Sequence, residues 1–274
     1  MLSDLRPLTL GELLDRTFSL YRKNFLLFVG IIALPHLILL AFQLSGVVFR
    51  MGGSATLQAA GVVWTLATVV VQLGVVAASQ GATVIAVSHL HLGRPTSIGE
   101  SFAGIKGRIL YLALITIGYG IGIGVGLILL IIPGIILGLM WALTIPVAVL
   151  EDTGLRDSVN RSAQLTKGAR GRVFVIYLLF LILLYAAYMV WMIPLFAIIG
   201  TMSRGHSNPS EVMLWTQITF PVGVFLGQCL VAPLMTIGLS LLYYDQRVRK
   251  EAFDLQHMMA ALDTPSGEAA GAAV

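Results

Sequence analysis

The sequence predicts an all-α integral membrane protein with six transmembrane helices, arranged as three hairpins that each follow an amphipathic cytoplasmic helix. Of the 274 residues, 57% are hydrophobic and only 11% are charged, whereas about a quarter of the residues in soluble domains are charged. Uncharged runs fill most of the chain, which excludes a disordered protein. The stretches between the runs are too short to form a DNA-binding module or a separate soluble catalytic domain. The runs cover residues 24–49, 51–93, 109–150, 173–203 and 212–244.

The number of spans follows from the thickness of the bilayer. A hydrocarbon core of about 30 Å requires about 20 helical residues, so three of the runs each predict one span. The run 109–150 is about twice that length, and Pro133 and Gly134 near its middle predict a turn between two helices. The run 51–93 opens with small and polar residues, which predict a loop before its helix. The six spans are expected at about 24–49, 60–88, 109–131, 134–150, 173–200 and 212–244.

These spans predict a single membrane domain over residues 1–263, followed by a disordered cytoplasmic tail at 264–274. Basic residues predict the orientation, because Lys and Arg stay on the cytoplasmic side during insertion. Both termini are therefore expected to be cytoplasmic, and no signal peptide is expected. The net charge of +4 is explained by contact with anionic lipid headgroups and requires no nucleic acid. Segments 1–23, 94–108, 151–172 and 245–274 hold 15 of the 17 basic residues.

The chain also shows a weak internal repeat. Residues 9–12 and 97–100 each form a capping box, in which a hydroxyl is followed three residues later by a glutamate. Each box begins a predicted cytoplasmic helix with apolar residues on one face. A third such helix is expected from Thr153, with a less regular cap, so the order of surface helix and hairpin recurs three times. A fourth surface helix is predicted at 245–259, after the last span.

A row of glycines lies in the third span. Gly118, Gly122 and Gly126 are one helical turn apart, so they align on one face and predict the close approach of a neighbouring helix. A nucleotide-binding loop is not predicted, because no strand precedes these glycines. The single Cys229 lies inside a predicted span and offers no disulfide or cysteine metal cluster.

Five polar side chains within the predicted spans are functional candidates. His36 is ionisable, which makes it a functional candidate by default, although a neutral imidazole bonded to a backbone carbonyl is the simpler alternative. Gln43, Gln72, Gln80 and Gln228 could line a polar path, but amides also bond adjacent helices, and we favour that use. The interior of the spans holds no carboxylate, which disfavours an ion-driven pump.

Five charged residues lie at similar depths on the predicted cytoplasmic side: Arg16, Arg161 and Arg247 with the carboxylates Glu151 and Asp245. If the three hairpins surround one axis, the guanidinium groups could bind a phosphodiester or phospholipid headgroup, supported by the two carboxylates. Ion pairs between surface helices and span ends are the alternative that we favour. No catalytic, cofactor or metal site is predicted, since neither an H-E-x-x-H nor a G-x-S-x-G motif is present.

Short motifs spread along the chain carry a family resemblance. GELLDR at 11–16 is followed by YRKNF at 21–25, and then by LGRP at 92–95, IPG at 132–134, PVAVLE at 146–151 and LYYD at 242–245. In this order, over roughly residues 6–260, the chain resembles the prokaryotic glycerophosphoryl diester phosphodiesterase membrane-domain family. The resemblance implies a prokaryotic plasma-membrane location. Some members carry a soluble phosphodiesterase barrel, which would need roughly 250 further residues and is not expected here.

The resemblance and the residues together lead us to expect a non-catalytic, lipid-associated scaffold or regulator linked to glycerophospholipid or phosphodiester metabolism. Its expected partners are membrane phospholipids and a separately encoded lipid or phosphodiester enzyme. A transporter of small solutes or lipids is the first alternative, and a membrane-embedded hydrolase is the second. A midplane cavity lined by His36 and the glutamines would favour transport, a basic cytoplasmic pocket would favour headgroup binding, and a metal with three protein ligands would favour the enzyme.

Overall fold

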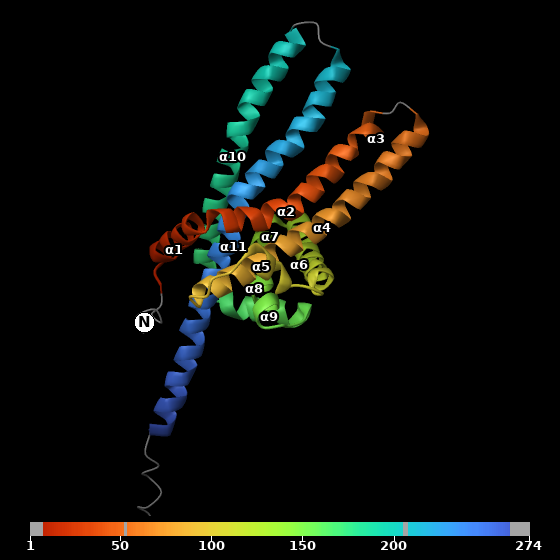
Figure 1. The fold of residues 1–274 in the computed structure, drawn as a ribbon. Coiled ribbons are helices and arrows are strands. Elements are labelled where there is room, and N and C mark those ends of the chain that lie inside the picture. The colour runs from red at the N-terminus through yellow and green to blue at the C-terminus, as the bar shows by residue number, and fades with distance from the viewer. Residues whose placement is uncertain (1–7, 52–53, 205–207, 264–274) are drawn as a thin grey trace, which may run out of the picture.

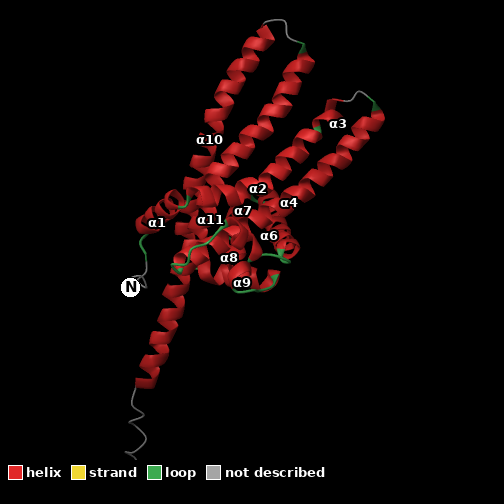
Figure 2. Cartoon of the chain, viewed as in Figure 1, coloured by secondary structure: helices red, strands yellow, loops and turns green. Residues whose placement is uncertain are grey.

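The computed structural model describes residues 8–51, 54–204 and 208–263, and every regular element among them is a helix (Figure 2). The predicted tail at 264–274 lies outside the described residues. Six of the helical segments are long and apolar enough to cross a membrane, which confirms the predicted fold class. The six segments are Phe25–Phe49, Ala55–His91, Ile109–Leu129, Ile131–Leu150, Arg170–Thr201 and Ser210–Glu251.

The chain begins with α1 (Leu10–Lys23), which buries Leu13 and Thr17 and is separated by Asn24 from α2 (Phe25–Ser45). The side chain of Thr9 accepts a hydrogen bond from the Glu12 N–H, and the Glu12 carboxylate accepts one from the Thr9 N–H. This confirms the first predicted capping box, and Ser97 and Glu100 form the second at the start of α5 (Ile98–Ala103). The caps bond N–H groups of the first turn, which have no partner within the helix.

Two pairs of long helices dominate the shape (Figure 1). One pair is α2 with α4 (Ala55–His91), joined through the short α3 (Val47–Met51), and the other is α10 (Arg170–Arg204) with α11 (Pro209–Asp263). Helices α2 and α11 pack together near the centre of the molecule, and the two pairs diverge toward the ends of α3 and α10. We call the diverging side the open end. The opposite side, where residues 94–108, 151–172 and 245–251 lie, is called the charged end.

The third and fourth spans form a shorter hairpin, but the predicted turn at residues 131–134 is wrong. Helix α6 (Ile109–Leu129) ends before Leu130, whose backbone is extended, and α7 (Ile131–Met140) includes Pro133 and Gly134 in its first turn. A proline lacks an N–H, but the first turn of a helix does not need that donor. Pro133 therefore lies at the start of a helix instead of breaking one. A second break at residues 141–143 leads to α8 (Thr144–Leu150).

The glycine row of α6 packs as predicted. A Cβ atom added at Gly118, Gly122 or Gly126 would lie 2.5 to 2.9 Å from the side chain of Leu155, Trp141 or Leu137, respectively. At Gly120 and Gly124, which point the other way, a Cβ atom would meet nothing within 4 Å. The three aligned glycines thus allow α7 and α9 (Leu155–Thr166) to approach α6 closely.

The last helix differs from its prediction. Its 55 residues correspond to about 82 Å at 1.5 Å per residue, far more than the hydrocarbon core. Residues 245–259, predicted as a separate surface helix, continue α11 without a break. The backbone of this segment therefore extends the line of the span and does not fold back toward the other helices. Helix α11 projects past the rest of the charged end (Figure 1).

Candidate functional site at the charged end and in the central cavity

The first polar cluster joins three helices at the charged end. We call it the Glu151 network, and it consists of Glu151, Arg161, Tyr243, Arg247 and Glu251. Arg161 donates to both Glu151 oxygens at 3.3 and 3.2 Å and to Glu251 at 2.5 Å, and Arg247 donates to Glu251 at 2.9 Å. The buried Tyr243 hydroxyl donates to Glu151 at 2.8 Å and accepts from Arg247 at 3.2 Å. Two arginines are thus matched by two carboxylates.

The positions of these five residues on α8, α9 and α11 explain why their side chains meet. Glu151 follows the last residue of α8, and Arg161 lies on α9, which folds back beside it. Tyr243, Arg247 and Glu251 are one turn apart on α11, so they share one face. Burial lowers the pKa of the Arg161 guanidinium, but the charges of Glu151 and Glu251 outweigh this effect and raise its pKa above the usual value. Arg161 therefore stays charged, and it links α8 to α11.

The second cluster, which we call the Asp245 network, holds the first described residue. The Asp245 carboxylate is fully buried and accepts hydrogen bonds from Arg172 at 3.0 Å, Arg249 at 2.8 Å and the Leu8 N–H at 2.8 Å. Both guanidinium groups also donate to the Leu8 carbonyl, at 3.3 and 2.6 Å. Among the described residues, two positive charges face one negative charge here, an excess of one positive charge. It connects Leu8, α10 and α11.

The five predicted charged residues are therefore not gathered at one site. Arg161, Arg247 and Glu151 share the Glu151 network, and Asp245 belongs to the Asp245 network. Asp245 and Arg247 are two residues apart on α11, which places them on nearly opposite sides of the helix. Arg16 is half-exposed on α1 and does not share the Glu151 network, whose members come from the α8 end, α9 and α11.

Besides the backbone of Leu8, four residues of these networks were missed in the sequence: Arg172, Arg249, Tyr243 and Glu251. The spacing of four residues between Asp245 and Arg249, and between Arg247 and Glu251, is a signal that predicts ion pairs along a helix. No comparable signal exists for Arg172, because its partner Asp245 is distant in the sequence. Pairs of that kind depend on how the helices pack.

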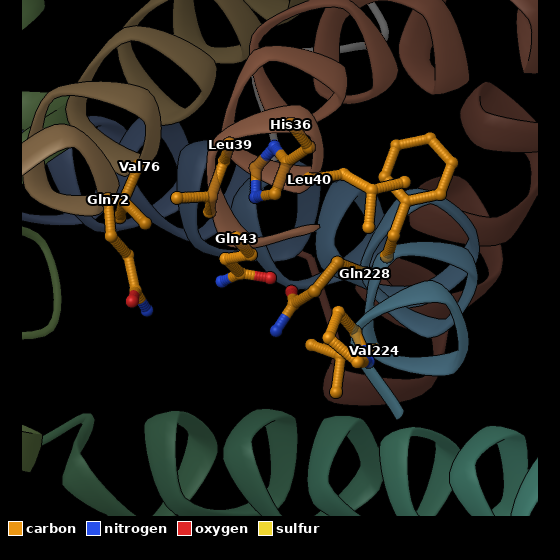
Figure 3. Close-up of a pocket in the computed structure, with 10 residues that line it drawn as sticks. His36, Leu39, Leu40, Gln43, Gln72, Val76, Val224 and Gln228 are labelled. Carbon is orange, nitrogen blue, oxygen red and sulfur yellow. The ribbon is translucent and has the colours of Figure 1, made fainter. Parts of the chain in front are cut away.

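Four of the five polar candidates from the predicted spans lie around a central cavity, away from both charged networks. A cavity of about 90 Å³ between α2, α4 and α11 is lined by His36, Gln43, Gln72 and Gln228, together with apolar side chains. The side chains of Gln43 and Gln228 point toward one another on the side of the His36 ring, and Gln72 lies apart from them on α4 (Figure 3). His36 Nδ1 lies 2.8 Å from the Ile32 carbonyl oxygen. The simpler alternative for His36, a bond to a backbone carbonyl, is thus observed, and its ring also lines the cavity.

Gln80 does not share this central cavity. It lies two turns from Gln72 on α4 and lines a smaller cavity of about 40 Å³ together with Tyr119 and Tyr177. The described residues contain no group of three or more His, Cys, Asp or Glu side chains placed to hold a metal ion. His89 and His91 instead contact Thr96 at 3.1 Å and the Tyr244 ring at a centroid distance of 4.5 Å, respectively.

Comparison with known proteins identifies the family. The family model for the membrane domain of glycerophosphoryl diester phosphodiesterase matches residues 113–266, a stretch that includes α7 to α11 and all members of both charged networks except Leu8. No curated protein and no solved structure matches the chain at a significant level. The family match covers more than half of the chain, includes the three motifs at 132–134, 146–151 and 242–245, and agrees with the six apolar helices. The chain belongs to the membrane-domain family of glycerophosphoryl diester phosphodiesterase.

Proposed function

We propose that this protein is a non-catalytic, lipid-associated scaffold or regulator of glycerophospholipid or phosphodiester metabolism that serves a separately encoded enzyme. In this proposal the charged end and both termini face the cytoplasm of a prokaryotic cell. The observation that carries the proposal is that the two networks tie Leu8, α8, α9, α10 and α11 together at the charged end. A surface whose helices are connected by such ion pairs and hydrogen bonds keeps its shape, which favours the binding of a partner protein or of lipid headgroups.

The two networks differ in charge balance, and we therefore expect them to differ in how strongly they bind an anionic lipid headgroup. A phosphate that approached Arg161 or Arg247 would have to compete with Glu151 and Glu251, which already bind these guanidinium groups. The Asp245 network has an excess positive charge, so its arginines have more capacity for an anionic headgroup. We therefore expect phospholipid contacts at Arg172 and Arg249 to be stronger than those at Arg161 and Arg247.

Mass spectrometry of lipids that co-purify with the gently extracted protein tests this order. The variants are Arg249→Ala, Arg161→Ala and Arg247→Ala, with Arg156→Ala as the control, because Arg156 is exposed on α9 outside both networks. The expected result is a loss of anionic lipid for Arg249→Ala and little change for the other variants. An unchanged lipid content in every variant would remove headgroup binding from the proposal.

The scaffold role is tested in cells that produce the protein. The double variant Glu151→Gln with Arg161→Gln removes the charges that join α8 to α9 while keeping the side chains similar in size. If the charged end supports an enzyme, the turnover of glycerophosphodiesters should fall in cells with the double variant and remain normal with Arg156→Ala. Equal turnover in cells with the parent protein, the double variant and no protein at all would contradict the proposed function.

A transporter of lipids or small solutes is a second candidate, and the cavity beside His36 is the observation that favours it. In vesicles that contain the purified protein, fluorescent lipid should then cross the bilayer faster than in protein-free vesicles, and Gln228→Leu should slow this movement. A rate equal to that of protein-free vesicles would exclude lipid transport.

A further inference from the structure

We propose that the central cavity between α2, α4 and α11 binds the uncharged, hydroxyl-bearing head of a glycerolipid, of which diacylglycerol is the simplest example. The inference deepens the proposed lipid-associated function and rests on it only in assuming that lipid surrounds the helices. It requires neither a partner enzyme nor the charged networks.

The depth of the cavity places it within the hydrocarbon region. His36 lies about 16 Å and Gln43 about 27 Å along α2 from Phe25, at 1.5 Å per residue. In a core of about 30 Å, these positions extend from the middle of the membrane toward the open end. At this depth, water is scarce, and a polar side chain without a partner is costly.

The lining offers hydrogen bonds that the protein does not use. Gln72 is exposed on α4, and among the described residues its amide has no hydrogen-bond partner. An amide that faces hydrocarbon without a hydrogen bond is costly, so a ligand that accepts from it is favoured. His36 Nδ1 must carry the proton, because the nearer of its two neighbours, the Ile32 carbonyl oxygen at 2.8 Å, can only accept, while the Ser79 hydroxyl lies 3.5 Å away. The contacts of His36 with these described residues are both made at Nδ1, which leaves Nε2 as the acceptor that can face a ligand.

The charge of the lining limits the class of ligand. The residues around the cavity are His36, three glutamines and apolar side chains, with no lysine, arginine, aspartate or glutamate. A phosphate would be buried there without a cationic partner, which is far more costly than burying a hydroxyl or an ester. A hydroxyl can donate to the His36 nitrogen, and an ester carbonyl can accept from the Gln72 amide, whereas the Gln228 amide already donates to the Tyr188 hydroxyl at 3.4 Å. These groups occur together on a glycerol that carries two acyl chains.

The size of the cavity favours a lipid head over a helix of a second copy. A volume of about 90 Å³ is smaller than the roughly 150 Å³ of a cavity that holds benzene, so it admits a few heavy atoms. A helix with its side chains is about 10 Å wide and cannot enter. The acyl chains have a path out of the cavity, because Val69, one turn from Gln72, and Phe220, two turns from Gln228, are half-exposed apolar residues on the side of the open end.

Photo-crosslinking in lipid nanodiscs tests the inference with the full chain. The probes are diacylglycerol, phosphatidic acid and triacylglycerol, each with a photoreactive group in an acyl chain. Gln72→Leu is the main variant, because Gln72 is exposed and its replacement leaves the core intact. Gln80→Leu is the matched control, since it makes the same change on the same helix outside the central cavity. His36→Leu and Gln228→Leu extend the test to the other walls, and thermal unfolding shows that each variant is folded.

We expect diacylglycerol to crosslink more strongly than the other probes. Gln72→Leu should reduce its crosslinking by about two- to tenfold, the equivalent of one hydrogen bond, whereas Gln80→Leu should leave it unchanged. Equal crosslinking by phosphatidic acid or triacylglycerol would overturn the inference, as would equal losses in Gln72→Leu and Gln80→Leu. Any of these failures would leave the scaffold test in cells unaffected.

Discussion

Replacement of Asp245 by asparagine should loosen the N-terminal segment and destabilise the protein. The change keeps the shape of the side chain but removes the charge that faces Arg172 and Arg249. One carboxylate oxygen accepts from both guanidinium groups and from Gln246 at 3.1 Å, and the other accepts from the Leu8 N–H. An amide has only one acceptor oxygen, so in either orientation an N–H₂ group would face a donor.

The magnitude follows from the hydrogen bonds that change. Bonds to a charged group contribute about 1.5–3 kcal/mol and neutral bonds about 0.5–1.5 kcal/mol, so each of the three weakened bonds costs about 1 kcal/mol, and the Leu8 bond is lost as well. Because Arg172 and Arg249 are each 30% exposed, water compensates part of this loss. We therefore expect a total cost of about 2–3 kcal/mol, which corresponds to a fall in Tm of about 5–10 °C.

The buried thiol of Cys229 provides the assay. A dye that fluoresces on reaction with a thiol reports unfolding in detergent, because Cys229 reacts only when the helices separate. Asp15→Asn is the control, since Asp15 is exposed on α1, and its replacement should change the stability by less than about 0.5 kcal/mol. If Asp245→Asn unfolds at the same temperature as Asp15→Asn, the Asp245 network does not stabilise the fold as argued.

Three further predictions concern packing and orientation. Gly134→Ala should cost about 1–3 kcal/mol, because its Cβ would lie 2.5 Å from the Leu127 backbone nitrogen, whereas Gly138→Ala on the same helix has free space and should not destabilise the protein; thermal unfolding compares the two. Ser162→Ala should lower the free energy of unfolding by about 1–3 kcal/mol, since the Ser162 hydroxyl accepts from the Leu143 N–H at 3.0 Å and donates to the Met140 carbonyl at 2.9 Å; an equal denaturation midpoint would contradict this. In the proposed topology, Arg94→Cys and Arg170→Cys should react with an impermeant thiol reagent from the cytoplasmic side only, and labelling from opposite sides would refute the shared orientation.

The capping boxes and the glycine row could be predicted because their partners are close in the sequence. Thr9 meets Glu12 within one turn, and the aligned glycines of α6 follow from 3.6 residues per turn. The turn after α6 was misplaced because proline interrupts a helix only after its first turn, and the sequence alone did not show where α7 begins. The length of α11 was missed for a related reason, since nothing in residues 245–259 stops a helix from continuing.

The residues of the candidate site could be predicted from the sequence, but which of them line the same cavity could not. His36, Gln43, Gln72 and Gln228 were identified as polar side chains in apolar spans, and the structure shows that they line one cavity while Gln80 lines another. Which amides meet depends on the rotation of each helix about its axis and on the angle at which helices cross. Side-chain packing across the whole bundle sets both quantities, so local spacing does not reveal them.

The sequence by itself determined that the chain has six helices long and apolar enough to cross a membrane, because the thickness of hydrocarbon sets the length of apolar helix that each crossing requires. It also determined which segments carry the charges. Only the tertiary structure decided that Glu151 pairs with Arg161 and contacts Arg247 through the Tyr243 hydroxyl, while Asp245 pairs with Arg172 and Arg249 and bonds Leu8. Neighbouring residues on α11 face different helices, and the physical reason is that a charge pairs with whatever packing brings within about 3 Å, however distant it is in the sequence.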